Sequence, residues 1–194
     1  MPEHGDALIV VDVQKDFLAG GALPVPGAGE ILAPLNFCLD AFSERKLPIF
    51  VTRDWHPEGH CSFRERGGPW PRHCVAGTQG ADFPEALRLP PAAAVISKGS
   101  EPKRDAYSGF DETNLEEQLL ALQVRRVVIA GLATDYCVRA TARDALQRGF
   151  SVAILLDAVR SVDYQTGQRA LAELREQGAT LTDSSKFIGE AATL

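Results

Sequence analysis

The chain has 194 residues, of which 45% are hydrophobic and 24% charged, a composition typical of a soluble globular protein. Its net charge of -6 argues against nucleic acid as a partner, because binding phosphate requires a basic face. The opening MPEHGDALIVVDV lacks the pattern of a signal peptide, and no apolar run approaches the roughly 20 residues of a membrane helix. We therefore expect one cytoplasmic domain over residues 1–194, with no membrane contact and with its four cysteines reduced.

Six short apolar runs, rich in valine and isoleucine, predict buried strands at 7–13, 47–54, 93–98, 125–131, 150–158 and 178–184. They do not alternate cleanly between apolar and polar residues, which is typical of parallel strands covered on both faces. Apolar residues at helical spacing between them predict helices at 30–45, 113–123, 134–149 and 164–178. This order favours an α/β fold, a doubly wound, mostly parallel six-stranded sheet with helices on both faces.

Residues 55–92 interrupt this pattern, because they are rich in Pro, Gly, Trp, Arg and His and show little periodicity. A loop of this length inside a compact domain is usually functional or disordered. Its aromatic residues, which include Trp55, Phe63, Trp70 and Phe83, argue against disorder. We therefore expect an ordered loop insertion that contributes to a binding site.

Polar residues stand at the ends of several predicted strands. Asp12, Asp54 and Lys98 each end one, and Cys137 follows the fourth in the first turn of the next helix. The carboxyl ends of parallel strands share one edge, where ligands bind. A helix N-terminus, which Thr134 could cap, favours a thiolate, Lys98 would add positive charge, and Asp12 could accept the thiol proton. These are the parts of an activated nucleophile, although a buried cysteine beside an unreactive Asp–Lys pair fits the spacing equally well.

Three of the four histidines lie within residues 56–73. Asp54 and His56 are two residues apart at a strand end, so their side chains can point the same way. Pro57 turns the chain so that His60 could swing back, and His73 arrives from the long loop. Two or three imidazoles with one carboxylate suit Zn, Fe or Mn. The alternative is a set of surface histidines on a polar loop.

Five stretches, taken together, resemble the nicotinamidase branch of the isochorismatase-like cysteine hydrolases, and the resemblance covers almost the whole chain. They are ALIVVDVQKDFLAGGALPVPGA, TRDWHPEGHCSF, WPRHCVAGTQGADF, SKGSEPKRDAYSGF and AGLATDYCVRATARDAL. The resemblance implies a Rossmann-type three-layer sandwich. It also implies an enzyme that hydrolyses nicotinamide to nicotinate and ammonia, as in NAD salvage, through a cysteine thioester.

The resemblance assigns roles to individual residues. The implied catalytic triad is Asp12, Lys98 and Cys137. The implied ligands of one divalent metal ion are Asp54, His56 and His73, with His60 as a further ligand in some relatives. The implied substrate pocket contains Phe17, Trp70 and Tyr107, with Leu132 and Tyr136 as further lining residues. A cis peptide bond between Leu132 and Ala133 would aim the Ala133 N–H, with that of Cys137, at the substrate carbonyl oxygen as an oxyanion hole.

Two alternatives to this hypothesis are kept. The chain could be an amidase of the same superfamily that acts on another small carboxamide or carbamoyl compound. It could also be a metal-binding protein on a hydrolase scaffold, which the fold alone would permit, although the intact triad argues against this. We expect a small-molecule substrate as the partner, and assembly into a homo-oligomer is compatible with the sequence. Asp135 and Asp157 are expected to have structural roles only.

Overall fold

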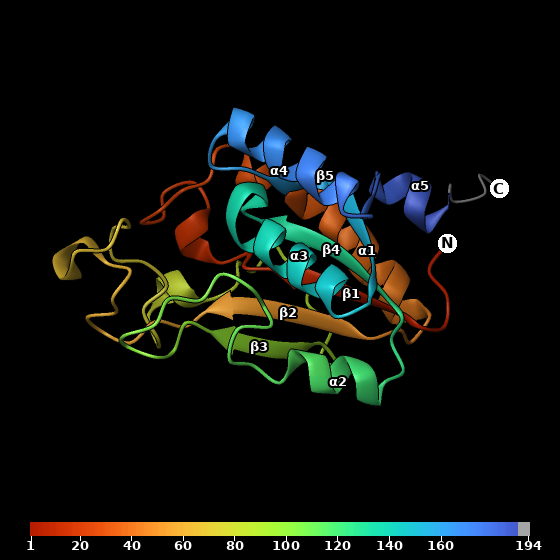
Figure 1. The fold of residues 1–194 in the computed structure, drawn as a ribbon, viewed down its shortest axis with the longest axis horizontal. Coiled ribbons are helices and arrows are strands. Elements are labelled where there is room, and N and C mark those ends of the chain that lie inside the picture. The colour runs from red at the N-terminus through yellow and green to blue at the C-terminus, as the bar shows by residue number, and fades with distance from the viewer. Residues whose placement is uncertain (190–194) are drawn as a thin grey trace.

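Six parallel strands form one sheet in the order β3-β2-β1-β4-β5-β6 within residues 1–189, the part of the chain that the computed structural model describes (Figure 1). The strands are β1 (Asp6–Val11), β2 (Ile49–Asp54), β3 (Ala94–Lys98), β4 (Arg126–Leu132), β5 (Ser151–Arg160) and β6 (Thr180–Thr182). The chain builds outward from β1 to β3, then crosses back beside β1 and builds outward again from β4. This order confirms the predicted doubly wound fold and puts its switch point between β1 and β4.

Helices cover both faces of the sheet. They are α1 (Leu32–Glu44), α2 (Leu115–Ala121), α3 (Arg139–Gln147), α4 (Tyr164–Glu176) and α5 (Ser184–Ile188). α1 and α5 pack on one face, and α2, α3 and α4 pack on the other (Figure 1). None of the helices within residues 1–189 is long and apolar enough to cross a membrane.

The central strand β1 explains why the strand pattern does not alternate. Leu8 and Val10 pack into the core under α1, whereas Ala7, Ile9 and Val11 pack into the core on the opposite face. All five side chains are fully buried. A strand that is covered on both faces requires apolar residues at every position, and this is the pattern that the sequence shows.

Two local features differ from the sequence-based expectation. The predicted helix over 134–149 begins with a wider π turn at Thr134–Val138 before α3, and Ala133, not Thr134, occupies the N-cap position without a side-chain cap. Helix α5 was not predicted, because five residues are too few to show a helical period. Its first residue, Ser184, donates hydrogen bonds from its N–H (2.8 Å) and its hydroxyl (2.5 Å) to the Asp157 carboxylate, which gives Asp157 the structural role expected for it.

The long segment between β2 and β3 is ordered, as predicted. It contains only the short 3-10 turns Arg64–Arg66 and Gln79–Ala81, and isolated bridges join His56 to Val75 and Phe63 to Trp70. Much of it extends past the carboxyl end of β2, at the left of Figure 1. The loop thus brings side chains from residues 55–92 to the same edge of the sheet as the strand ends.

Candidate active site

The carboxyl edge of the sheet brings the predicted catalytic residues together. Asp12 directly follows β1, and Asp54 and Lys98 are register partners at the ends of β2 and β3. Cys137 lies in the turn that follows β4. The close approach of β4 to β1 requires glycine at Gly131, because its φ is +117° and a Cβ there would lie 2.1 Å from the carbonyl oxygen of Val11.

A buried lysine joins the acidic residues to the cysteine. Lys98 is only 1% exposed, and its Nζ lies 2.9 Å from Asp12 Oδ2 and 3.5 Å from Cys137 Sγ. It also forms a close ion pair with Asp54. The other oxygen of Asp12 accepts a hydrogen bond from the Thr52 hydroxyl (2.6 Å). One ammonium group therefore balances two buried carboxylates and faces the thiol.

The charges of these groups follow from burial and from each other. Burial lowers the pKa of Lys98, but Asp12 and Asp54 outweigh it and raise that pKa well above its usual value. Burial opposes ionisation of Asp54, yet Lys98 and His56 hold its pKa below the usual value. Burial raises the pKa of Asp12, and Lys98 offsets this only in part. Lys98 and Asp54 thus form the charged pair, and Asp12 is the carboxylate with the greater tendency to accept a proton.

Cys137 is a thiol in this environment. Burial raises its pKa well above the usual value, Asp12 and Asp54 act in the same direction, and the opposing effect of Lys98 is smaller. The thiolate that a helix N-terminus would favour therefore has to be formed during the reaction, because burial and the two carboxylates favour the thiol in the resting site. Asp12 Oδ2 is the oxygen that Lys98 Nζ contacts at 2.9 Å, and carboxylate oxygens of Asp12 and Asp54 lie within 4.8 Å of the Cys137 sulfur. Asp12 is thus placed to receive the thiol proton.

The Leu132–Ala133 peptide bond is cis, as the resemblance implies. It joins the end of β4 to the turn that carries Cys137. Ala133 and Cys137 both line the pocket described below, so the two residues expected to form the oxyanion hole share one cavity.

Three of the four predicted metal ligands converge. Ligand atoms of Asp54, His56 and His73 lie within 4.8 Å of one another, and all three side chains are buried. His56 Nδ1 bonds to the carbonyl oxygen of Gly99 (2.9 Å), and His73 Nδ1 bonds to that of Pro71 (2.7 Å). Carbonyl acceptors at Nδ1 place a proton there and leave the Nε2 lone pairs free for a cation, as is usual for metal-binding histidines. The donor set and its outer hydrogen bonds thus fit a divalent metal ion.

His60 does not join this group. Its ring stacks on that of His56 with 4.2 Å between centroids, while Nδ1 bonds to the Ser62 hydroxyl (2.7 Å) and Nε2 bonds to the carbonyl oxygen of Arg104 (3.0 Å). Both ring nitrogens are therefore engaged by the protein. The structure does not support His60 as a ligand, because its two ring nitrogens bond to other protein groups and its ring packs against that of His56.

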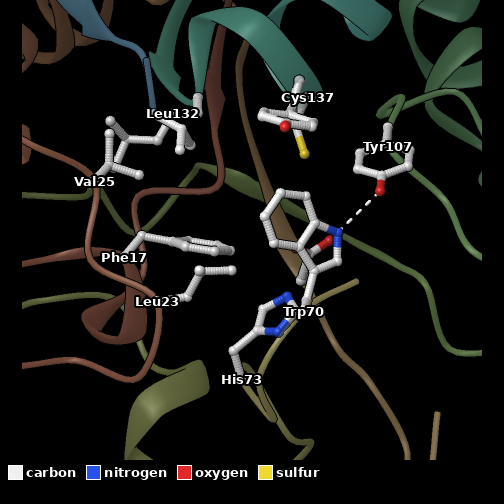
Figure 2. Close-up of a pocket in the computed structure, with 12 residues that line it drawn as sticks. Phe17, Leu23, Val25, Trp70, His73, Tyr107, Leu132 and Cys137 are labelled. Atoms are coloured by element: carbon white, nitrogen blue, oxygen red, sulfur yellow. Dashed lines mark hydrogen bonds between the residues drawn. The ribbon is translucent and has the colours of Figure 1, made fainter. Parts of the chain in front are cut away.

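The cysteine opens into a largely apolar pocket, and small-molecule sites are typically of this kind. In Figure 2 the Cys137 sulfur points into this pocket. Trp70 Nε1 donates a hydrogen bond to the Tyr107 hydroxyl (3.0 Å), and Tyr136 packs its ring at 5.0 Å from Trp70, edge to face. The five aromatic and apolar residues expected in the pocket all line it: Phe17, Trp70, Tyr107, Leu132 and Tyr136.

Three residues of the pocket wall were not predicted from the sequence: Leu23, Val25 and Val162. Phe17 and Leu23 lie on the opposite side of the cavity from Tyr107 (Figure 2). For Leu23 and Val25 the sequence offered one signal, the apolar stretch ALPV that lies between glycines. Val162 offered only its place after a strand end, and Asp135 holds it there by accepting a hydrogen bond from its N–H (3.0 Å).

Comparisons with known proteins agree with this geometry. The sequence profile described as the isochorismatase domain matches residues 6–186. The nicotinamidase of Escherichia coli is 36% identical, over 90% of this chain and 93% of its own. The crystal structure of the pyrazinamidase of Pyrococcus horikoshii in complex with zinc is 51% identical, with a TM-score of 0.90 over 92% of this chain and 99% of its own. A structure of PnC1 from L. infantum in complex with nicotinate is 41% identical, with a TM-score of 0.89 over 94% of each chain.

Proposed function

Because the chain belongs to the isochorismatase family, we propose that it hydrolyses nicotinamide to nicotinate and ammonia. The observation that carries this proposal is the Cys137 thiol, which lies beside Asp12 and Lys98 and opens into an apolar pocket. The pocket has the aromatic lining that a planar ring requires. The nicotinamidase and pyrazinamidase relatives support the same substrate class.

The first half of the reaction forms a thioester. Asp12 removes the proton of the Cys137 thiol as the sulfur attacks the carboxamide carbon, and the positive charge of Lys98 stabilises the developing thiolate. The N–H groups of Ala133 and Cys137 donate hydrogen bonds to the oxyanion, each contributing typically a few kcal/mol. Asp12 then gives its proton to the amide nitrogen, the C–N bond breaks and ammonia leaves.

The second half hydrolyses the thioester. Asp12, again ionised, accepts a proton from a water molecule as the water oxygen adds to the acyl carbon. When the C–S bond breaks, the proton on Asp12 returns to the sulfur of Cys137, and the product leaves as nicotinic acid, which loses its carboxyl proton to water to give nicotinate. The raised pKa of Asp12, caused by burial, brings this carboxyl closer to the pKa that suits an acid–base catalyst near neutral pH.

The pocket positions the substrate ring. Phe17, Trp70 and Tyr107 would flank the pyridine, and their apolar surfaces favour an aromatic carboxamide over a flexible carbamoyl compound. A divalent ion, Zn, Fe or Mn, held by Asp54 and the two histidines His56 and His73 would supply a Lewis acid for the pyridine nitrogen. The zinc complex of the Pyrococcus horikoshii relative supports such an ion. The cytoplasmic location, the single domain over 1–194 and a homo-oligomeric state stay predictions.

The test is ammonia release from nicotinamide by the purified, metal-loaded protein, with Cys137→Ala as the inactive control. We expect turnover by the wild type and none by the variant, at matched folding by circular dichroism. Faster turnover of a carbamoyl compound than of nicotinamide would favour the other amidase hypothesis. If the zinc-loaded protein released no ammonia from any carboxamide, the result would favour the hypothesis of a metal-binding protein on a hydrolase scaffold.

A further inference from the structure

The segment that follows β1 carries polar residues at alternate positions, Asp12, Gln14 and Asp16. Asp12 belongs to the catalytic group, whereas the mechanism above uses neither of the others. We propose that Gln14 and Asp16 are positioning residues that hold Asp54 and His73 at the separation required to bind a metal ion. This inference rests on the metal site of the proposed function and concerns how the chain builds that site.

Gln14 fixes the backbone of Asp54. Its side chain is 0% exposed. Its Nε2 donates hydrogen bonds to the carbonyl oxygens of Asp54 (2.7 Å) and Ala81 (3.0 Å), and its Oε1 accepts one from the N–H of Asp54 (2.8 Å). The amide thus pairs with both backbone polar groups of Asp54, as a neighbouring strand would, and also ties Ala81 to them. Because the backbone of Asp54 is held on both sides, the direction of its carboxylate is restricted.

Asp16 fixes the backbone beside His73. Its Oδ2 accepts a hydrogen bond from the N–H of Cys74 (2.7 Å), and its Oδ1 accepts one from the N–H of Ala22 (3.2 Å). Cys74 has a φ of +45°, a left-handed conformation that residues other than glycine adopt rarely and that requires support from their surroundings. The Asp16 carboxylate provides that support, and a Cβ at Gly80 would lie 2.2 Å from its Oδ2, so the carboxylate fills the space that this glycine leaves.

The same backbone also reaches His56. The carbonyl oxygen of Cys74 accepts a hydrogen bond from the N–H of His56 (3.0 Å), and the carbonyl oxygen of His56 accepts one from the N–H of Ala76 (2.8 Å). Asp16 is therefore linked through Cys74 to both histidine ligands, while Gln14 is linked to Asp54. Hydrogen bonds therefore connect all three ligand positions to one short segment, and that segment also carries the catalytic base Asp12.

A purely structural role for these residues makes a different prediction. If they only satisfy buried backbone groups, their replacement lowers stability and leaves metal affinity unchanged. If they position ligands, replacement weakens metal binding, because partners outside the ligands typically change metal affinity 10- to 100-fold. Zinc affinity therefore separates the two roles without reference to catalysis.

The experiment measures the zinc dissociation constant of the folded protein by competition with a chelator of known affinity. Asp16→Asn keeps the shape of the side chain, but its single oxygen cannot accept both backbone hydrogen bonds. We expect zinc to bind about 10- to 100-fold more weakly than in the wild type. Gln14→Glu, which can accept from the Asp54 N–H but cannot donate to its carbonyl oxygen, is the second variant and should weaken zinc in the same direction.

Asp157→Asn is the matched control. Asp157 is also a half-buried carboxylate that accepts a backbone hydrogen bond, from Ser184 at 2.8 Å, but it lies outside the metal group. This variant should lose thermal stability and keep the wild-type zinc affinity. Wild-type zinc affinity in both Asp16→Asn and Gln14→Glu would overturn the inference. A wild type that binds no zinc would overturn it together with the metal site, whereas zinc binding without nicotinamide hydrolysis would remove only the proposed function.

Discussion

Thr52 offers a sharp test of how the site controls the charge of Asp12. Its hydroxyl donates a 2.6 Å hydrogen bond to Asp12 Oδ1 and its side chain is fully buried. This bond opposes the rise that burial causes in the pKa of Asp12. Thr52→Val removes the hydroxyl and keeps the branched shape. It removes the donor to the carboxylate and also an acceptor 3.3 Å from the Asp12 N–H, which keeps its bond to the carbonyl oxygen of Thr52 (3.2 Å).

The size of the effect follows from the kind of bond. A hydrogen bond to a charged group contributes about 1.5–3 kcal/mol, and we expect Thr52→Val to lower the free energy of unfolding at neutral pH by about that amount. Since 1.36 kcal/mol is a factor of ten in a protonation equilibrium, the variant should shift Asp12 toward its protonated form by up to about 100-fold. A further rise in the pKa of Asp12 is the expected direction.

The pH dependence has a definite sign. Because the folded-state pKa of Asp12 lies above its ordinary value of 3.8, the folded chain binds this proton more readily than the unfolded chain. Ionised Asp12 therefore costs stability at neutral pH, and stability is recovered as pH falls through the folded-state pKa toward 3.8. The stability lost in Thr52→Val should be greatest at neutral pH and should shrink on acidification.

The assay is the pH profile of kcat/KM for nicotinamide, whose acid limb reports the catalytic base of the free enzyme. We expect this limb to move to higher pH in Thr52→Val. Thr141→Val is the control, because Thr141 is also fully buried and accepts a hydrogen bond from the N–H of Gly109 (2.9 Å). It should lose stability with an unchanged pH profile. An acid limb that stays in place in Thr52→Val, while stability falls, would refute the role given to Asp12.

Three further predictions test the metal group, the pocket wall and the sheet edge. His56→Ala or treatment with a chelator should abolish or sharply reduce nicotinamide turnover. His60→Ala should retain zinc by metal analysis, because both ring nitrogens of His60 bond to the protein. Loss of zinc from His60→Ala would show instead that His60 is a ligand. Val162→Ala should lower kcat/KM for nicotinamide about tenfold, since it removes roughly two methyl groups of apolar contact; unchanged kinetics would show that the ring does not reach this wall. Gly131→Ala should lower the denaturation midpoint, since a Cβ would lie 2.1 Å from the Val11 carbonyl oxygen and strained backbone alone costs about 1–3 kcal/mol; a wild-type midpoint would contradict this.

The sequence by itself was sufficient to predict the strands of the sheet and many residues of the site. Strands covered on both faces need apolar residues at successive positions, so the runs around Val10 and Ile129 could be recognised locally. Parallel strands share a carboxyl edge, so Asp12, Asp54 and Lys98 could be predicted to meet there. The resemblance then assigned roles to these residues and to the aromatic residues. The four aromatic residues it named, Phe17, Trp70, Tyr107 and Tyr136, all line the pocket.

Only the tertiary structure decided what each side chain meets. His60 directs its two ring nitrogens at the Ser62 hydroxyl and at the carbonyl oxygen of Arg104, which is 44 residues away in the chain. The pKa of the Cys137 thiol is raised by burial, which depends on every element around it, and by Asp12 and Asp54, which come from other strands. Secondary structure follows from patterns within a few residues, whereas hydrogen-bond partners and loss of water arise from segments that meet only in the folded chain.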